Sequence, residues 1–166
     1  MEKDAAYDTA DSHMYPGTYV ANPGGGVNND LWLLDLEDTS FHRLTDYPTK
    51  RSLLDPQPFT GVLHPHFSPD GGQVLYGYMF SGGEDFGLWR MQLADFDSAA
   101  DTIIQVDSFC CEDYDVTWFE THGFSPGGDT IIFTANPRPD QPAHFADICL
   151  MDLATRELVN LTSEFD

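Results

Sequence analysis

The sequence predicts an all-β fold, because two motifs recur at nearly the same spacing and no segment shows a helical period. The segment DLWLLDL at 30–36 returns as GLWRMQL at 87–93 and as DICLMDL at 147–153, with offsets of 87 − 30 = 57 and 147 − 87 = 60. Independently, HFSPDG at 66–71 returns as GFSPGG at 123–128, with the offset 123 − 66 = 57. Periods of about 20–50 residues are typical of solenoids and propellers, and a slightly longer period fits the same architecture with inserted loops.

Each repeat contains four short strand patterns separated by turns, which is the content of one propeller blade. The expected strands are, from the innermost outward, 63–68 and 119–125, then 73–80 and 130–135, then 30–36, 87–93 and 147–153, and finally 41–45, 102–106 and 158–162. The sequence therefore predicts a partial β-propeller of about three four-stranded antiparallel blades.

These strands divide the chain into segments. We expect a disordered or irregular segment at 1–18, an incomplete first blade at 19–46, a linker at 47–62, a second blade at 63–107, a linker at 108–118 and a third blade at 119–166. The third hairpin of the second blade is longer, since Gly87 and Val106 are further apart in sequence (106 − 87 = 19) than the corresponding ends in the other blades (44 − 30 = 14 and 161 − 147 = 14). We expect the extra length, around DFDSAAD, to form a loop.

The chain is strongly acidic, with 28 Asp and Glu against 7 Lys and Arg and a formal net charge of −21. Such a surface repels phosphate groups, so we expect neither nucleic acid nor an anionic lipid surface as a partner. Aspartates that close tight turns, such as Asp35, Asp70 and Asp152, account for part of the acidity. Turns do not explain the scarcity of lysine, which indicates a halophilic or marine source, where salt screens carboxylate repulsion. No run approaches the ~20 apolar residues of a membrane span, so we expect no membrane insertion.

Two long matches carry a family resemblance. HPHFSPDGGQVLYGY followed by GLWRMQL, and THGFSPGGDTIIFTAN followed by DICLMDLATRELVNLT, resemble the propeller repeat of TolB-type proteins. The resemblance covers 64–107 and 121–164 as two full repeats, and 19–46 as the last three strands of a preceding one. Gly127 departs from the pattern, which has Asp at this position. The residues that define the repeat are Phe67, Ser68, Pro69, Asp70 and Gly71 in the second blade, and Phe124, Ser125, Pro126 and Gly127 in the third.

The resemblance implies a non-catalytic binding or scaffolding role, in protein–protein or small-ligand recognition. It leaves open a metal-dependent enzyme similar to oligogalacturonate lyases, and a regulatory propeller of a peptidase. A closed propeller needs about 4–8 blades, so we expect the ring to be completed by further blades of a longer polypeptide or by a homo-oligomeric partner. The resemblance also implies an extracytoplasmic location, periplasmic or secreted, although MEKDAAYDTADSH at the N-terminus has no apolar core of a secretory signal.

His64 and His66 are the candidate metal ligands, because histidine is a common ligand and alternate residues of one strand share a face. In the resembling lyases, metal-binding histidines lie on the innermost strand. Aligning Phe67 with Phe124 places His122 on the opposite face of its blade, which breaks a three-histidine cluster. The alternative is that both histidines are hydrogen-bonded residues of a channel without metal.

The acidic loops are a second candidate, for calcium, which takes 6–8 oxygen ligands. Neither loop matches the helix-flanked calcium loop, and a solvated acidic loop is the simpler interpretation. We expect no other cofactor. The carboxylates concerned are Asp95, Asp97 and Asp101 in the long hairpin, and Asp113 and Asp115 in the second linker.

No catalytic constellation is visible in the sequence. GxSxG is absent, and Ser68 and Ser125 lie in turns where they serve backbone geometry. The three cysteines, Cys110, Cys111 and Cys149, lack CxxC spacing and are expected to be unpaired.

Overall fold

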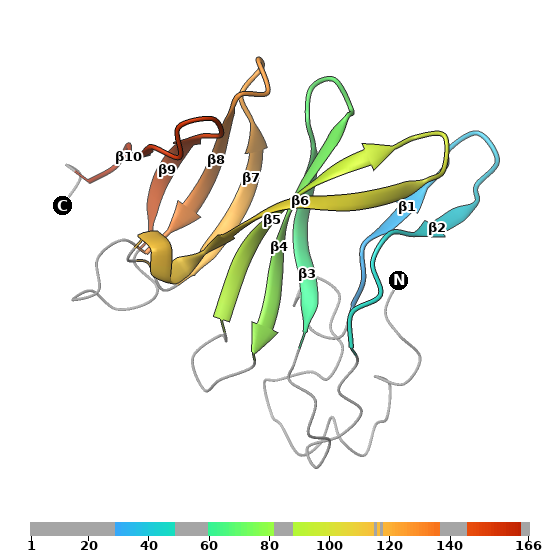
Figure 1. Cartoon of the computed structure of the whole chain (residues 1–166), viewed down its shortest axis with the longest axis horizontal. Coiled ribbons are helices and arrows are strands. Elements are labelled where there is room, and N and C mark those ends of the chain that lie inside the picture. Colours follow the sequence, from blue (N-terminus) through green and yellow to red (C-terminus); the bar gives the residue numbers. More distant parts are fainter. Residues whose placement is uncertain are drawn as a thin grey trace, which may run out of the picture.

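The structure is all-β and consists of three antiparallel sheets that lie side by side across the molecule (Figure 1). It is a computed structural model, and it describes residues 29–48, 60–81, 88–114, 116, 118–136 and 146–163. A single 3-10 turn, η2 (Cys111–Tyr114), is the only helical element of these residues. The first sheet pairs β1 (Trp32–Leu34) with β2 (Phe41–Arg43); the middle sheet contains β3 (Gly61–Phe67), β4 (Gln73–Ser81), β5 (Leu88–Asp97) and β6 (Thr102–Cys110); the terminal sheet contains β7 (Phe119–Phe124), β8 (Thr130–Ala135), β9 (Asp147–Asp152) and β10 (Leu158–Asn160).

Both four-stranded sheets are meanders, because each strand pairs with the next strand along the chain. Alternation of buried and less buried residues in β8 follows the two-residue period of a strand. The strands expected from the sequence are confirmed wherever the structure describes them, with small differences at their ends. Residues 1–28, which include the start of the expected first blade, and residues 49–59 of the expected linker lie outside the described residues. β6 runs to Cys110 and η2 follows, so the expected linker at 108–118 begins as a strand.

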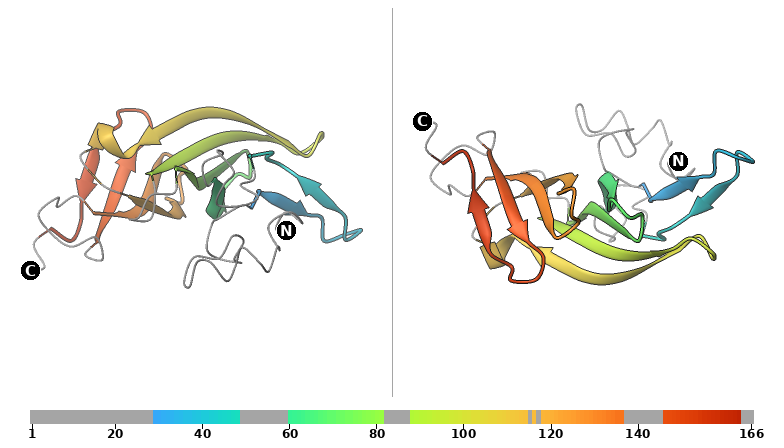
Figure 2. Two further views of the ribbon diagram at one scale, coloured as in Figure 1. Left: turned by 90° about the horizontal axis from the view of Figure 1, so that it is seen from below. Right: turned by 90° about the horizontal axis from the view of Figure 1, so that it is seen from above.

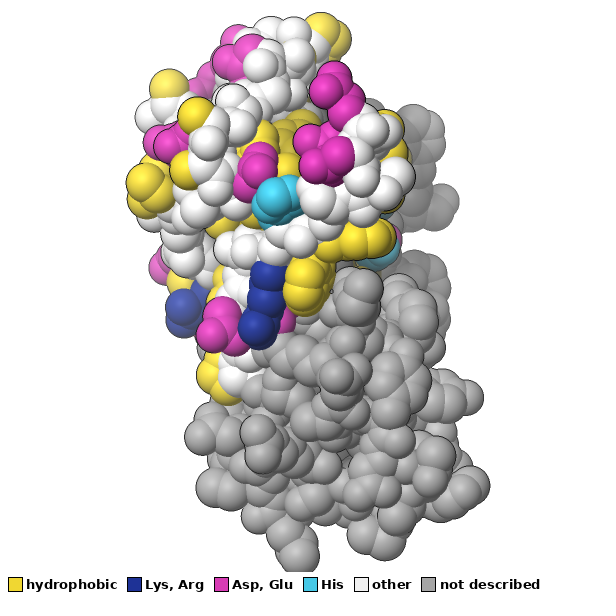
Figure 3. Space-filling view, turned by 90° about the vertical axis from the view of Figure 1, so that its right-hand side faces the viewer, with side chains coloured by type: hydrophobic (Ala, Val, Ile, Leu, Met, Phe, Trp, Pro, Cys, Tyr) yellow, Lys and Arg dark blue, Asp and Glu magenta, His cyan; other side chains and the backbone are white. Residues whose placement is uncertain are grey.

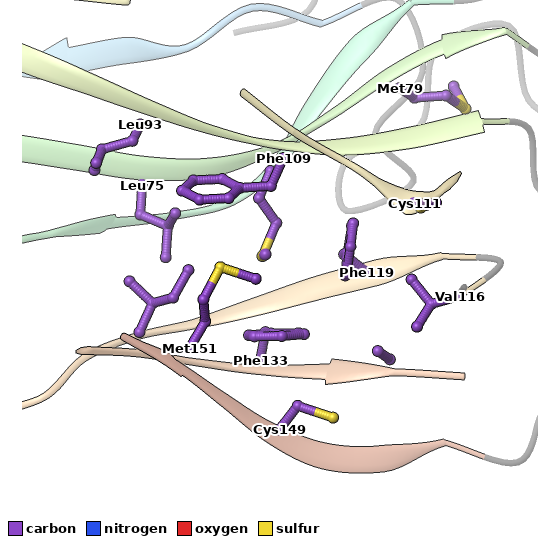
Figure 4. Packing of buried hydrophobic residues seen from close by; sticks show 13 residues of the cluster. Leu75, Met79, Leu93, Phe109, Cys111, Val116, Phe119, Phe133, Cys149 and Met151 are labelled. Carbon is purple, nitrogen blue, oxygen red and sulfur yellow. The ribbon is translucent and has the colours of Figure 1, made fainter. Parts of the chain in front are cut away.

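A large apolar core lies between the middle and terminal sheets (Figure 4). Leu75, Leu93 and Phe109 of the middle sheet face Phe133 and Met151 of the terminal sheet. The ring of Phe119 also meets Phe133 edge-on, with centroids 5.4 Å apart. The full set of buried residues in this core is Leu75, Met79, Met91, Leu93, Phe109, Cys111, Val116, Phe119, Ile131, Phe133, Ala135, Cys149 and Met151.

A smaller core lies on the opposite face of the middle sheet, against the first sheet. Its buried residues are Leu31, Val62, Val74, Tyr76 and Ala94, and Leu44, Phe96 and Ile103 pack against them. The middle sheet is therefore covered on both faces.

The segment expected as a loop insertion forms strand instead. β5 and β6 continue as a ladder through the pairs Asp95–Ile104 and Asp97–Thr102, so the extra length extends both strands and the turn lies beyond them. Phe96 and Ile103 account for this, because they pair across the ladder and pack against the smaller core. Figure 2 shows the hairpin reaching toward the tip of the first sheet, where Asp101 Oδ2 lies 3.4 Å from His42 Nδ1.

The strand register corrects one motif match. Asp95 pairs with Gln73 and Asp152 pairs with Thr130, so the two pairs are related by a single offset, since 130 − 73 and 152 − 95 are both 57. The counterpart of DICLMD at 147–152 is therefore RMQLAD at 90–95, which begins further along the chain than the GLWRMQL match. Both segments contain similar apolar residues, and only the pairing with β4 decides between them.

Candidate functional site

The candidate site lies where β3 and β7, the first strands of the two large sheets, run next to each other. His66 Nε2 donates to the carbonyl oxygen of Thr121 at 3.0 Å. The Thr121 hydroxyl donates to the carbonyl oxygen of His64 at 2.6 Å. His64 Nδ1 lies 3.4 Å from Glu120 Oε1. We call these four residues the β3–β7 seam; they connect the two sheets through polar groups beside the apolar core.

β3 and β7 both depart from regular strand geometry, and they do so at equivalent positions of the two repeats. The β3–β4 register shifts between Leu63 and His66, and His64 has a φ of 46°. The β7–β8 register shifts between Thr121 and Gly123, and Gly123 has a φ of 127°. A bulge bends its strand and redirects side chains. Both imidazoles thus reach β7 through an irregular backbone, and simple alternation along β3 does not account for their placement.

The two histidines already have partners within the protein. His66 is hydrogen-bonded to backbone and His64 is next to a carboxylate, whereas His122 interacts with the Thr134 hydroxyl at 3.0 Å. Among the described residues, no three His, Cys, Asp or Glu side chains come together as ligands for a metal ion. The seam therefore joins the two sheets, and its described residues offer an incoming ion at most a His–Glu pair.

The acidic candidates are dispersed. Asp95 Oδ1 accepts from Gln73 Nε2, Asp97 Oδ1 accepts from the N–H of Ala99, and Asp101 faces His42. Asp113 is exposed on η2, and Asp115 lies outside the described residues. Each described carboxylate of the hairpin thus contacts a group of its own hairpin or of a neighbouring strand.

The two Ser-Pro turns close the β3–β4 and β7–β8 hairpins in the same way. In the first, Ser68 N donates to Gln73 O, and the Ser68 hydroxyl donates to Asp70 Oδ1 at 2.6 Å. This hydroxyl, followed by the N–H of Gly72, holds the pKa of the Asp70 carboxyl below its ordinary value. Phe67, Pro69 and Gly71 complete this turn, with Gly71 at a φ of 74°.

In the second turn, the carboxylate that accepts from the serine hydroxyl comes from a different position. Gly127 stands where the first turn has Asp70, and the Ser125 hydroxyl donates instead to Asp129 Oδ1 at 2.8 Å. Gly128 takes the left-handed conformation, with a φ of 78°. Asp129 therefore supplies the carboxylate that is missing at Gly127. Phe124 and Pro126 hold the same places as Phe67 and Pro69.

A shallow hollow of about 300 Å³ separates these two turns. It is lined by Ser68, Pro69, Asp70, Gln73, Pro126, Gly127 and Gly128. The hollow is formed by the two Ser-Pro turns, and the serine hydroxyls are hydrogen-bonded within those turns. Its shape therefore follows from the repeated turn structure.

Two sets of polar contacts, which were not expected from the sequence, hold the sheets in place. Buried Asp147 accepts from the hydroxyl of Thr162 at 2.7 Å and from Asn160 Nδ2 at 2.9 Å, and that threonine oxygen accepts from Ile148 N. In the first sheet, Asp30, Thr45 and Leu31 N repeat this arrangement. The signal was present, because an Asp and a Thr stand at the same separation at 30 and 45 and at 147 and 162.

The second set of contacts involves Arg156, in the β9–β10 turn. It pairs with Asp107 of β6, and its guanidinium carbon lies 4.5 Å from the centroid of the Phe109 ring. Arg156 thus fastens the terminal sheet to the middle sheet. Long-range placement of this kind leaves no local pattern in the sequence.

All three cysteines are free, and burial raises the pKa of the Cys149 thiol to about 11. No thiolate is therefore available there near neutral pH. Within the described part of the chain, no helix has the length and apolar character needed to cross a bilayer. No protein-family model matches the chain, and a search of the curated proteins finds no significant match.

Proposed function

We propose that the chain forms consecutive blades of a TolB-like β-propeller and acts by binding, as a scaffold without catalysis of its own. The observation that carries this proposal is the face-to-face packing of meander sheets with their first strands adjacent at the β3–β7 seam. In a propeller, the first strand of every blade lies nearest the axis and the blades diverge outward.

The repeated turns and clamps also support the proposal. The Ser68 and Ser125 turns are equivalent in hydrogen bonding, and the Asp–Thr clamp recurs in the first and terminal sheets. Repeats of this kind bury their apolar faces only by stacking on neighbours, which is how the middle sheet is covered on both faces.

A binding role is favoured over metal-dependent catalysis by the state of the candidate residues. His66 is bonded to backbone, and His64 is next to Glu120. A catalytic metal needs at least about three protein ligands and an open position. Zinc titration by calorimetry separates the two roles: we expect no stoichiometric binding that disappears in His64→Ala, and such binding would favour the enzyme.

The propeller arrangement is tested by spin-label distances within one chain. Labels introduced as non-natural ketone side chains leave the native cysteines intact, and dilution with unlabelled protein removes distances between chains. We expect a short distance between positions 65 and 122, on the inner strands, and a clearly longer one between positions 105 and 159, on the outer strands. Equal distances would indicate a flat sandwich and would overturn the proposal.

A further inference from the structure

The outer face of the terminal sheet carries an apolar patch beside Thr134, and no described strand packs on it. Its residues are Ile132, Ile148, Leu150 and Leu161, which we call the terminal apolar face. Ile148 is 40% exposed and Leu161 is 47% exposed, while Ile132 and Leu150 are half-buried. The free face of an antiparallel sheet ordinarily carries polar side chains. An apolar free face indicates an interface.

In the middle sheet, the residues equivalent to the terminal apolar face are covered by another sheet. The strand register gives Leu75, Met91 and Leu93 as the counterparts of Ile132, Ile148 and Leu150, each at the same offset, and the β5–β6 and β9–β10 pairings give Phe109 as the counterpart of Leu161. These four counterparts are at most 6% exposed, because the terminal sheet covers them. The terminal apolar face therefore presents the residues that receive a neighbouring sheet.

The complementary surface lies on the first sheet. Leu34 and Phe41 are 43% and 54% exposed, and they pair across β1 and β2. Their counterparts two repeats later are Met151 and Leu158, which pack against the middle sheet. Figure 3, which views the molecule from the side of the first sheet, shows exposed hydrophobic side chains among the carboxylates. The first sheet thus carries the other half of the same kind of interface.

We propose that a second copy of this chain occupies the terminal apolar face with its first sheet. The two surfaces lie at opposite ends of the molecule (Figure 1), so the contact is head-to-tail, and a reciprocal contact closes a dimer. This inference rests on the proposed propeller arrangement, in which equivalent sheets stack through equivalent faces. One chain carries both halves of the interface, so a second copy offers a surface that matches each of them.

Sedimentation velocity at protein concentrations from about 1 to 100 μM tests the proposal, because the fraction of dimer rises with protein concentration. We expect a dimer for the unaltered chain. Ile148→Asp and Leu34→Asp should each weaken dimerisation by at least about tenfold, since each places a charge in an apolar contact. Ile104→Asp is the matched control, because Ile104 is 68% exposed on β6 and lies on neither surface. It should dimerise normally.

Mixing the two variants is the decisive step. A heterodimer of Ile148→Asp with Leu34→Asp contains one doubly altered contact and one unaltered contact, so the mixture should recover part of the dimer that each variant loses on its own. Circular dichroism and thermal unfolding verify that both variants remain folded.

A monomer throughout the range, a dimer that survives Ile148→Asp, open chains longer than a dimer, or a mixture without recovery would each overturn the proposal. The spin-label distances are measured within single chains. A monomer that keeps short inner and long outer distances therefore refutes only this inference, whereas equal distances refute the proposed function itself.

Discussion

The middle and terminal sheets are built from the same repeat but lie in different surroundings. Both are four-stranded meanders whose first hairpin is closed by a Ser-Pro turn, and their strands pair in equivalent register. The middle sheet is covered on both faces, so Leu93 is buried, whereas its counterpart Leu150 in the terminal sheet is only half-buried. The comparison teaches that a strand pattern defines which residues share a face, while the neighbouring sheet decides whether that face becomes core.

The largest expected effect comes from substituting this matched leucine pair. Leu93→Ala should lower the free energy of unfolding by about 2–5 kcal/mol, as for other buried leucines, because it leaves a cavity between two sheets. Leu150→Ala should cost less than about half as much in dilute, monomeric protein. Urea unfolding at about 1 μM measures both. Equal losses would show that the terminal sheet is covered in solution and would remove the distinction.

The Asp–Thr clamp distinguishes the two sheets in a second way. By strand register, Cys110 of the middle sheet holds the place of Thr162 in the terminal sheet. Thr162→Val removes a donor from buried Asp147 and an acceptor from Ile148 N, so we expect a loss of about 1–3 kcal/mol. Cys110→Val should change the stability by less than about 0.5 kcal/mol. Similar losses in thermal unfolding would mean that the clamp is not what holds β9 to β10.

Arg156 connects the two sheets, and its removal should have a smaller effect. Arg156→Gln removes a half-exposed ion pair with Asp107 and a cation–π contact with Phe109, which together contribute about 1 kcal/mol. A double-mutant cycle with Asp107→Asn isolates the ion pair, and that coupling should shrink as salt rises. A coupling of zero at low salt would contradict the role of Arg156 as a fastener.

The smallest effect concerns pH and the first Ser-Pro turn. The folded pKa of Asp70 is lowered from 3.8, chiefly by the Ser68 hydroxyl, so its ionised form stabilises the fold above that pH. This contribution is lost as pH falls from about 4 through the lower folded pKa. We expect Asp70→Asn to be slightly less stable than the unaltered chain at pH 6, with the difference disappearing near pH 2. A difference that persists at pH 2 would exclude ionisation as its origin.

The strands and the two turns could be predicted from the sequence, because alternating apolar residues and Ser-Pro punctuation are local signals. The register of β5 could not, since GLWRMQL and RMQLAD are equally suitable strands and only pairing with β4 selects one. The fate of the extra hairpin length also depended on a distant contact, the packing of Phe96 and Ile103 on the smaller core. At the seam, His64 and His66 were identified by residue type, but the double bulge and Glu120 come from tertiary structure.

The exchange of the turn carboxylate between Asp70 and Asp129 restricts how such repeats can diverge. A Cβ at Gly72 would lie 3.4 Å from Asp70 Oδ1, and a Cβ at Gly127 would lie 3.3 Å from Asp129 Oδ1, so an acid added at either position would contact the acid that the turn already has. Moving the acid from the Asp70 position to the position that Asp129 holds takes two substitutions. Made singly, they leave the turn either with no carboxylate or with two carboxylates in contact. We therefore expect the exchange Asp70→Gly with Gly72→Asp to be more stable than either single change, measured by urea unfolding. The two positions therefore act together: a turn keeps a single bonded carboxylate only when one acid is lost as the other is gained.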